Sequence, residues 1–193
     1  MENSLIQGLV ERISQAASMH SSVGVVLPSN NYHNFNQAVF EFMRMKNMHP
    51  WVYVTTTKPY NIIKQQQQEI IESINVRFID CVSLAAGITP DDDRCYYLDS
   101  PSQLEKLILE VMSFVKEKAG MEPPFIIIDS LSSLSLFNDE LLVTEFLTHL
   151  VNNLRLYNAH LVSLCIDEEM NDTINKMLYI KNEKILKIQE SFI

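Results

Sequence analysis

Short apolar runs alternate with amphipathic stretches along most of the chain, and turn residues separate them. The apolar runs predict strands at residues 23–27, 51–55, 76–82, 125–129 and 160–166, with a shorter strand at 95–98. The amphipathic stretches carry apolar residues three or four positions apart, which predicts helices at residues 4–17, 34–43, 59–73, 100–120 and 139–157. This alternation predicts an α/β fold, with a mostly parallel sheet and helices on both of its faces.

The strand at 125–129 is the most apolar of these runs, because four large apolar residues follow one another before Asp129. Such a run predicts a strand that helices cover on both sides. In the helix expected at 139–157, the residues predicted to face the core are Leu142, Phe146, Leu150 and Leu154.

The length of 193 residues is sufficient for one domain with a full core. We expect a single domain, made of an N-terminal helix at 1–20, a core at 23–166, and a C-terminal helix and β-hairpin at 167–193. Leu5, Leu9 and Ile13 share one helix face, which favours packing of this helix on its own domain. Apolar residues on both sides of Asn182 predict the hairpin, and Ser100 is a candidate cap that starts a helix.

The formal net charge of −9 argues against a nucleic-acid surface and against docking on an anionic membrane. No apolar run reaches the length of a membrane span, and the first residues lack the basic and apolar pattern of a signal peptide. The three cysteines have no metal-ligand spacing, which indicates free thiols in a reducing compartment. Adjacent residues do not point the same way, so the acidic run at 91–93 is not expected to bind metal. We therefore expect a cytoplasmic protein without a metal site.

Asp129 and the run Ser130-Leu131-Ser132-Ser133 follow the central strand. The carboxyl ends of parallel strands are where α/β proteins bind ligands. An aspartate at this position is where a phosphate-binding ATPase would hold its magnesium ion. Ser130 is expected to cap or turn the chain, because no nucleophile elbow surrounds it.

The order of these elements over residues 20–190 resembles the RecA/KaiC-like P-loop ATPase superfamily. The run from Asp129 to Ser133 looks like the family's magnesium-linked aspartate strand, and residues 78–80 look like its third strand. Residues 53–60 are most similar to archaeal KaiC-related proteins without a phosphate loop. The resemblance implies a RecA-like three-layer α/β/α sandwich.

The phosphate loop that this resemblance calls for is absent from the sequence. A working loop reads G-x-x-x-x-G-K-[ST], because glycines expose backbone N–H groups and the lysine binds phosphate oxygens. Residues 28–35 contain no glycine, no lysine and no hydroxyl at the required place. The family's catalytic glutamate would fall within residues 55–58, which contain no carboxylate. We therefore expect no ATPase activity, no catalytic residues and no cofactor.

Two functions remain open at this stage. The first is a non-catalytic KaiC-like pseudo-ATPase that acts as a regulatory or protein-interaction module, with protein partners that include a second copy of the chain. The alternative is an enzyme or binding protein for a small anionic ligand at the vestigial phosphate site. The residues expected at this site are Asn30, Asn31, His33, Asn34, Thr55, Asp129 and Ser130. A receiver-like domain fits less well, because Pro28 and Ser29 stand where it needs an acidic pair.

Overall fold

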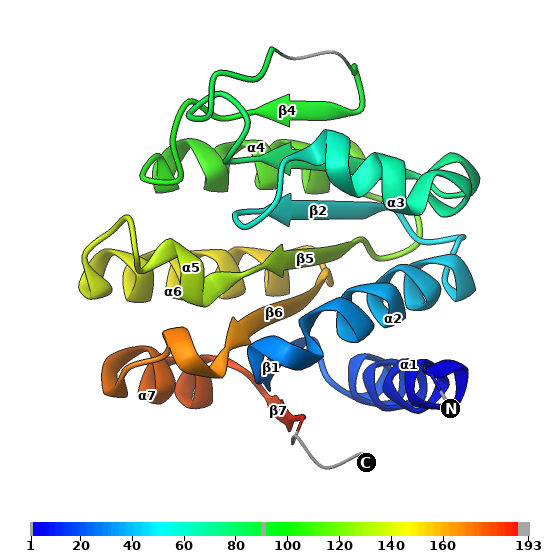
Figure 1. Ribbon diagram of the computed structural model, residues 1–193. Coiled ribbons are helices and arrows are strands. Elements are labelled where there is room, and N and C mark those ends of the chain that lie inside the picture. Colours follow the sequence, from blue (N-terminus) through cyan, green and yellow to red (C-terminus); the bar gives the residue numbers. More distant parts are fainter. Residues whose placement is uncertain (1, 90–91, 189–193) are drawn as a thin grey trace.

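The structure is a computed structural model that describes residues 2–89 and 92–188. Its centre is a seven-stranded sheet with the order β4-β3-β2-β5-β6-β1-β7, and every neighbouring pair is parallel (Figure 1). The strands are β1 (Ser22–Leu27), β2 (Trp51–Thr55), β3 (Val76–Asp80), β4 (Cys95–Tyr97), β5 (Phe125–Asp129), β6 (His160–Ile166) and β7 (Lys184–Lys187). The predicted α/β fold is therefore confirmed.

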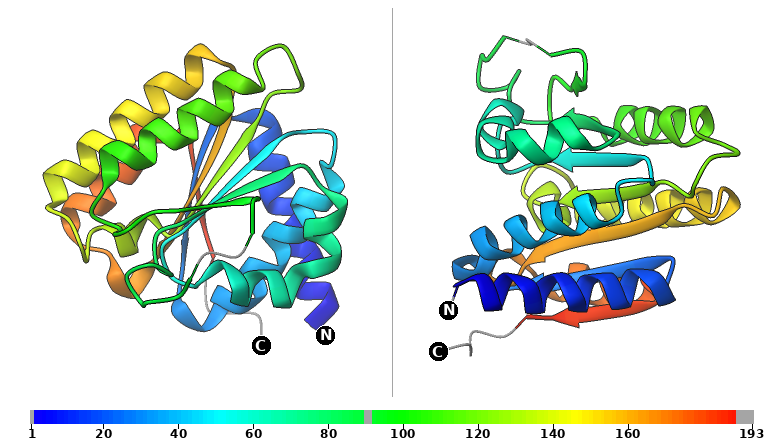
Figure 2. Two further views of the ribbon diagram at one scale, coloured as in Figure 1. Left: turned by 90° about the horizontal axis from the view of Figure 1, so that it is seen from above. Right: turned by 90° about the vertical axis from the view of Figure 1, so that its right-hand side faces the viewer.

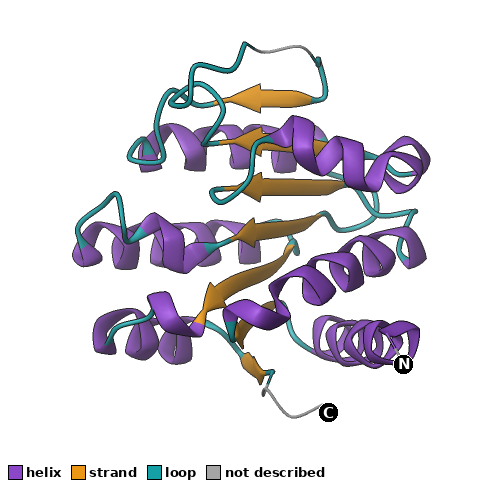
Figure 3. Cartoon of the chain, viewed as in Figure 1, coloured by secondary structure: helices purple, strands orange, loops and turns teal. Residues whose placement is uncertain are grey.

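Helices cover the sheet on both faces, which gives three layers (Figures 2 and 3). One face carries α1 (Glu2–Met19), α2 (Tyr32–Met45) and α3 (Tyr60–Ser73). The other face carries α4 (Leu104–Glu117), α6 (Glu140–Leu156) and α7 (Asp172–Lys181), and the short α5 (Leu131–Leu134) follows β5. None of the helices within residues 2–89 and 92–188 combines the length and the apolar character needed to cross a bilayer.

The apolar run in β5 is explained by this double cover. Phe125 and Ile127 pack against α1, α2 and α3, whereas Ile126 and Ile128 pack against α4, α6 and α7. Successive side chains of a strand point to opposite faces, so a strand covered on both sides needs apolar residues at every position.

Aromatic rings stack across the amino ends of the three central strands. The ring centroids lie 4.6 Å apart for Trp51 and Phe125, and 4.5 Å apart for Phe125 and His160. These residues are register partners across β2, β5 and β6. The stack stabilises the register that places Thr55 opposite Asp129 at the other end of β2 and β5.

The predicted C-terminal β-hairpin is wrong. Residues 172–181 form α7, and residues 184–187 form one strand that pairs in parallel with β1. The side chain of Asn171 caps α7 by accepting a hydrogen bond from the Ile174 N–H at 2.9 Å. Met177 and Leu178 then continue a buried helical stripe, so helical spacing prevails over strand alternation here. Residues 189–193 of the predicted C-terminal region lie outside the described residues.

Three local predictions also need correction, while one is confirmed. The second helix begins at Tyr32 after a 3-10 turn (Ser29–Asn31), not near Asn34. The fourth begins at Leu104, because Ser100 accepts from the Ser102 N–H and forms a turn instead of a helix cap. Leu142 was expected in the core but is 52% exposed. The N-terminal helix does pack on its own domain, through Leu9, Val10, Ile13, Ala16 and Ala17.

Gly24 in β1 offers a test of how closely the side chains of α7 and of the neighbouring strand β7 approach β1. A Cβ atom at this position would lie 2.7 Å from Ile185 Cδ1 and 2.9 Å from Leu178 Cγ. We expect Gly24→Ala to lower the free energy of unfolding by about 1–3 kcal/mol, because the added methyl overpacks this face. Urea unfolding followed by circular dichroism measures the change.

Gly8 provides a matched control for this substitution. It lies inside α1, and nothing approaches its added Cβ within 4 Å. Gly8→Ala should raise the free energy of unfolding by about 1 kcal/mol, because alanine favours the helix. A Gly24→Ala variant as stable as the wild type would contradict the close approach of α7 to β1.

Candidate functional site

Asp129 ends the central strand β5, and its side chain is buried. Its Oδ2 atom accepts hydrogen bonds from the Tyr32 hydroxyl at 2.6 Å, from the Tyr53 hydroxyl, and from Asn36 Nδ2 at 3.3 Å. Asn36 Nδ2 also lies 2.7 Å from the Tyr53 hydroxyl. Tyr32 and Asn36 come from the first turns of α2, so the amino-terminal end of this helix contacts the end of β5. The carboxylate therefore contacts donors of its own chain and is closed to solvent.

Burial governs the protonation of this cluster. Desolvation raises the pKa of Asp129, and the hydrogen bonds from Tyr32 and Tyr53 offset this only in part. The other carboxylate oxygen, Oδ1, is buried without a hydrogen-bond partner among the described residues. Desolvation and the nearby Asp129 charge raise the pKa of both tyrosines, so the phenols stay protonated and act as donors. Three side chains of the protein therefore donate to Oδ2 of Asp129, while its Oδ1 has no hydrogen-bond partner among the described residues.

The turn after β1 is held by a carboxylate from another part of the chain. The backbone N–H of Ser29 lies 2.9 Å from both carboxylate oxygens of Glu168, and the Ser29 hydroxyl donates to Glu168 Oε1 at 2.7 Å. These bonds lower the pKa of Glu168. Backbone N–H groups before a helix are typical anion sites, and here Glu168 itself supplies the anion.

The serines after Asp129 are also held internally. The Ser130 side chain caps α5 by accepting from the Ser133 N–H at 3.2 Å. The hydroxyls of Ser132 and Ser133 each donate to Glu169 Oε2 at 2.8 Å. Ser130 is buried, and its backbone N–H donates to Thr56 Oγ1 at 2.8 Å. The expected capping role of Ser130 is confirmed.

The end of β2 carries hydroxyl side chains, from Thr55 to Thr57. Thr55 Oγ1 is buried and donates to the Lys58 carbonyl at 2.6 Å. Thr57 Oγ1 lies 2.9 Å from the Tyr32 hydroxyl. The Lys58 ammonium lies 4.8 Å from the centroid of the Tyr32 ring, which is a cation–π distance. The segment after β2 therefore contacts Tyr32 through Thr57 and Lys58.

The structure brings together only part of the predicted site. Thr55, Asp129 and Ser130 lie side by side at the ends of β2 and β5. Asn30 and His33 are exposed, and His33 Nε2 lies 3.2 Å from Gln37 Nε2. Asn34 lies inside α2 and Asn31 at its N-cap, with no side-chain cap there.

Sequence reasoning missed the groups that hold Asp129, namely Tyr32, Asn36 and Tyr53. It also missed Glu168, which holds the turn at Ser29. One signal was present. Tyr32 and Asn36 are four residues apart, which places them on the same side of α2. A buried polar pair on an otherwise apolar helix face indicates a polar partner on the sheet.

Two further aspartates are engaged in structural contacts. Asp80 ends β3 and accepts hydrogen bonds from the backbone N–H groups of Tyr60, Val82 and Ser83, and from the Ser83 hydroxyl. Burial alone would raise the pKa of Asp92. Hydrogen bonds lower this pKa to about 2, and the largest contribution among them comes from Lys64, whose Nζ lies 2.6 Å from Asp92 Oδ2. Asp91, in the same acidic run, lies outside the described residues.

Among the described residues, no group of histidine, cysteine, aspartate or glutamate is placed to hold a metal ion.

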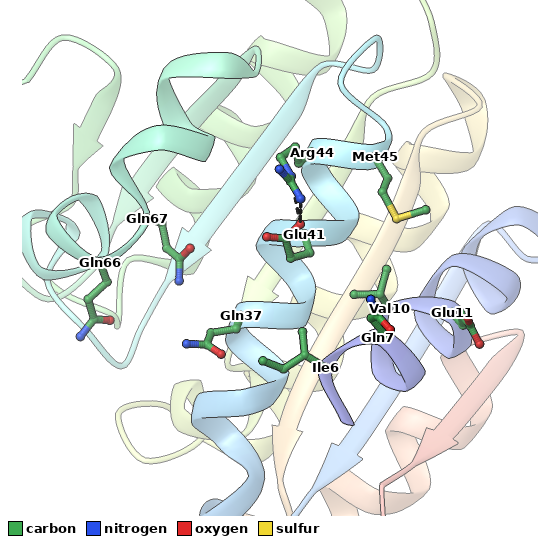
Figure 4. A pocket seen from close by; sticks show the side chains of 10 residues that line it. All are labelled: Ile6, Gln7, Val10, Glu11, Gln37, Glu41, Arg44, Met45, Gln66 and Gln67. Carbon is green, nitrogen blue, oxygen red and sulfur yellow. Dashed lines mark hydrogen bonds and ion pairs between the residues drawn. The ribbon is translucent and has the colours of Figure 1, made fainter. Parts of the chain in front are cut away.

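A surface groove of about 770 Å³ lies between α1, α2 and α3 (Figure 4). It is lined by Ile6, Gln7, Val10, Glu11, Gln37, Glu41, Arg44, Met45, Gln66 and Gln67. Its one arginine, Arg44, pairs with Glu41 at 2.5 Å. Asp129 does not line this groove, and the arginine is already neutralised, so the groove has no free cation for an anionic ligand.

No known protein family matches the sequence, and no curated protein matches it either. Solved structures of similar shape do exist. An uncharacterized protein, PH0321, from Pyrococcus horikoshii, solved with an unknown peptide, is 13% identical with a TM-score of 0.65 over 88% of this chain and 78% of that chain. The KaiC-like protein PH0186 from Pyrococcus horikoshii OT3 is 14% identical, with a TM-score of 0.59 over 90% of this chain and 74% of that chain.

The flagellar accessory protein FlaH from Methanocaldococcus jannaschii is also similar, at 14% identity and a TM-score of 0.57 over 86% of this chain and 70% of that chain. Identities this low establish the fold and nothing more. The chain therefore has an α/β fold of the RecA/KaiC-like kind, with archaeal structural neighbours.

The raised pKa of Asp129 gives stability a pH dependence that can be measured. The folded protein holds this proton more tightly than the unfolded chain, so ionisation of Asp129 lowers the free energy of unfolding as pH rises. Asp129→Asn removes the ionisable group but keeps an acceptor oxygen. We expect wild-type stability, relative to Asp129→Asn, to fall from about pH 4 upward and to level off above the folded-state pKa. Urea unfolding of both proteins across this range measures the two free energies of unfolding. A wild-type value that rises with pH relative to that of Asp129→Asn would contradict the prediction.

Proposed function

We propose that this protein is a non-catalytic KaiC-like pseudo-ATPase that acts as a regulatory or protein-interaction module. One observation carries the proposal. Tyr32, in the segment where a phosphate loop would bind nucleotide, is partly buried and donates a hydrogen bond to Asp129. The residue that resembles the magnesium-linked aspartate is thereby committed to the fold.

The charges around the former phosphate position support this proposal. Glu168 accepts from the Ser29 N–H, Glu169 accepts from the serines of α5, and Asp129 lies beneath Tyr32. A triphosphate placed here would meet carboxylates where an ATPase supplies a lysine and backbone donors. Phosphoryl transfer depends on positioning and charge stabilisation, and neither is provided by residues 28–35.

An interaction role agrees with two further observations. The structural neighbour PH0321 was solved with an unknown peptide, so a related fold does bind peptide segments. The three free cysteines are buried, and burial raises the pKa of Cys81 and Cys165 to about 12, which keeps both thiols unreactive. We propose a cytoplasmic location, with protein partners and without nucleic acid or membrane.

The alternative, a small anionic ligand at the vestigial site, has weaker support. Such a ligand would need free donors or cations beside Asp129. The Ser29 N–H is occupied by Glu168, and the Lys58 ammonium lies over the Tyr32 ring. The exposed residues Asn30 and His33 offer only solvent-facing contacts.

Mg-ATP titration tests the proposed function directly. We expect no saturable heat in isothermal titration up to about 1 mM Mg-ATP. A dissociation constant above about 1 mM corresponds to a binding free energy of less than about 4 kcal/mol in magnitude. Phosphate release should equal the buffer blank, and Asp129→Ala should leave it unchanged. An active RecA-like ATPase with a complete phosphate loop serves as the positive control. Micromolar binding, or phosphate release that Asp129→Ala abolishes, would overturn the proposal.

A further inference from the structure

A second groove, of about 620 Å³, runs between α4 and α6, which lie side by side on one face of the sheet (Figure 2). We refer to it as the α4–α6 groove. Its lining residues are Ser102, Gln103, Leu104, Glu105, Lys106, Ile108, Asn138, Leu142, Glu145, Phe146, His149 and Asn153. None of the residues described at the Asp129 cluster belongs to it, so it is a separate surface.

One largely exposed apolar side chain lines this groove, and others lie close to its lining residues along the chain. Leu142 lines it and is 52% exposed, although its helix position would allow burial. Leu136 and Phe137 precede the lining residue Asn138, and they are 64% and 54% exposed. Leu141 and Leu109 are exposed next to Leu142 and one turn from Glu105, respectively. Apolar patches of this kind, bordered by polar residues, typically mark protein interaction sites.

The shape of the groove fits a helix. Along α6 the lining residues recur every three or four positions from Leu142 to Asn153. Twelve residues of helix correspond to about 18 Å, or about three turns. A groove of this length between two helices accommodates the apolar stripe of a third helix, which is an established mode of peptide recognition.

The charge around the groove indicates which kind of helix fits. The acidic residues that line the groove are Glu105 and Glu145. The one lysine, Lys106, is 3.5 Å from Asp99 and is therefore already paired. A helix whose apolar stripe is flanked by lysine or arginine is complementary to this border. A second copy docked symmetrically would oppose carboxylates to carboxylates, which disfavours self-association through this surface.

From this combination we infer that the α4–α6 groove binds a basic amphipathic helix of a partner protein. The apolar stripe of that helix packs on the lining residues Ile108 and Leu142, while its flanking cations pair with Glu105 and Glu145. The inference deepens the proposed interaction role by naming the surface and the class of partner. It rests on that role but not on the loss of ATP binding.

Fluorescence anisotropy with a synthetic peptide tests the inference on the full chain. The probe is a labelled leucine–lysine amphipathic helix of about 18 residues, or about five turns. Leu142→Ser and Glu145→Lys should each weaken binding by about tenfold or more, because both residues line the groove. Leu156→Ser and Glu69→Lys are matched controls, since both residues are exposed and lie outside the groove, and they should change binding by less than about twofold.

Several outcomes would overturn the inference. One is no measurable binding, and another is equal loss in groove variants and controls, which would mean general charge attraction. Equal binding of a sequence-scrambled peptide without an apolar stripe would have the same meaning. Light scattering that detects a dimer abolished by Leu142→Ser would assign the groove to self-association instead. The Mg-ATP titration separates the two proposals: ATP binding with intact peptide binding would overturn only the pseudo-ATPase, and lost peptide binding without ATP binding would overturn only the groove.

Discussion

A carboxylate buried at the end of the central strand needs hydrogen-bond donors, because transfer of an unpaired charge out of water is costly. Asp129 obtains them from Tyr32, Tyr53 and Asn36. Two of these donors belong to α2 and one to the neighbouring strand β2, so the network joins the first strand–helix unit to the middle of the sheet. The first turns of α2 therefore lie near the carboxyl end of β5, where Tyr32 and Asn36 donate to Asp129.

The same physical solution recurs at the neighbouring strand ends. Glu168 accepts from the turn after β1, and Glu169 accepts from the serines of α5. Both glutamates follow β6, whose end lies between those of β1 and β5 in the sheet. The carboxyl edge is thus closed by carboxylates and hydroxyls that satisfy one another. In a nucleotide-binding protein these donors would face phosphates, whereas here they stabilise the fold.

The strands and most helices could be predicted from sequence, because apolar spacing depends on neighbouring residues alone. The chemical site was predicted only in part. Asp129 ends a recognisable strand, but its partner Tyr32 is 97 positions away, and only the folded sheet brings the two together. The hairpin prediction failed because the residues around Asn182 satisfy both strand and helix spacing over a short length. The cap at Asn171 and the buried face of Leu178 decide for the helix.

The closed network also bears on the position of the exposed apolar surface. The hydrogen-bond network around Asp129 is linked to the α4–α6 groove by α5. Along the chain, α5 lies between Asp129 and the segment that carries Leu136 and Phe137. Buried Leu131 and Leu134 anchor α5 in the core, and Glu169 holds its serine hydroxyls. Two exposed apolar residues on a free loop would lose much conformational entropy when a partner binds. Attached to an anchored helical turn, they are already ordered, so the polar contacts at the carboxyl edge of the sheet would lower the entropic cost of the docking that we propose.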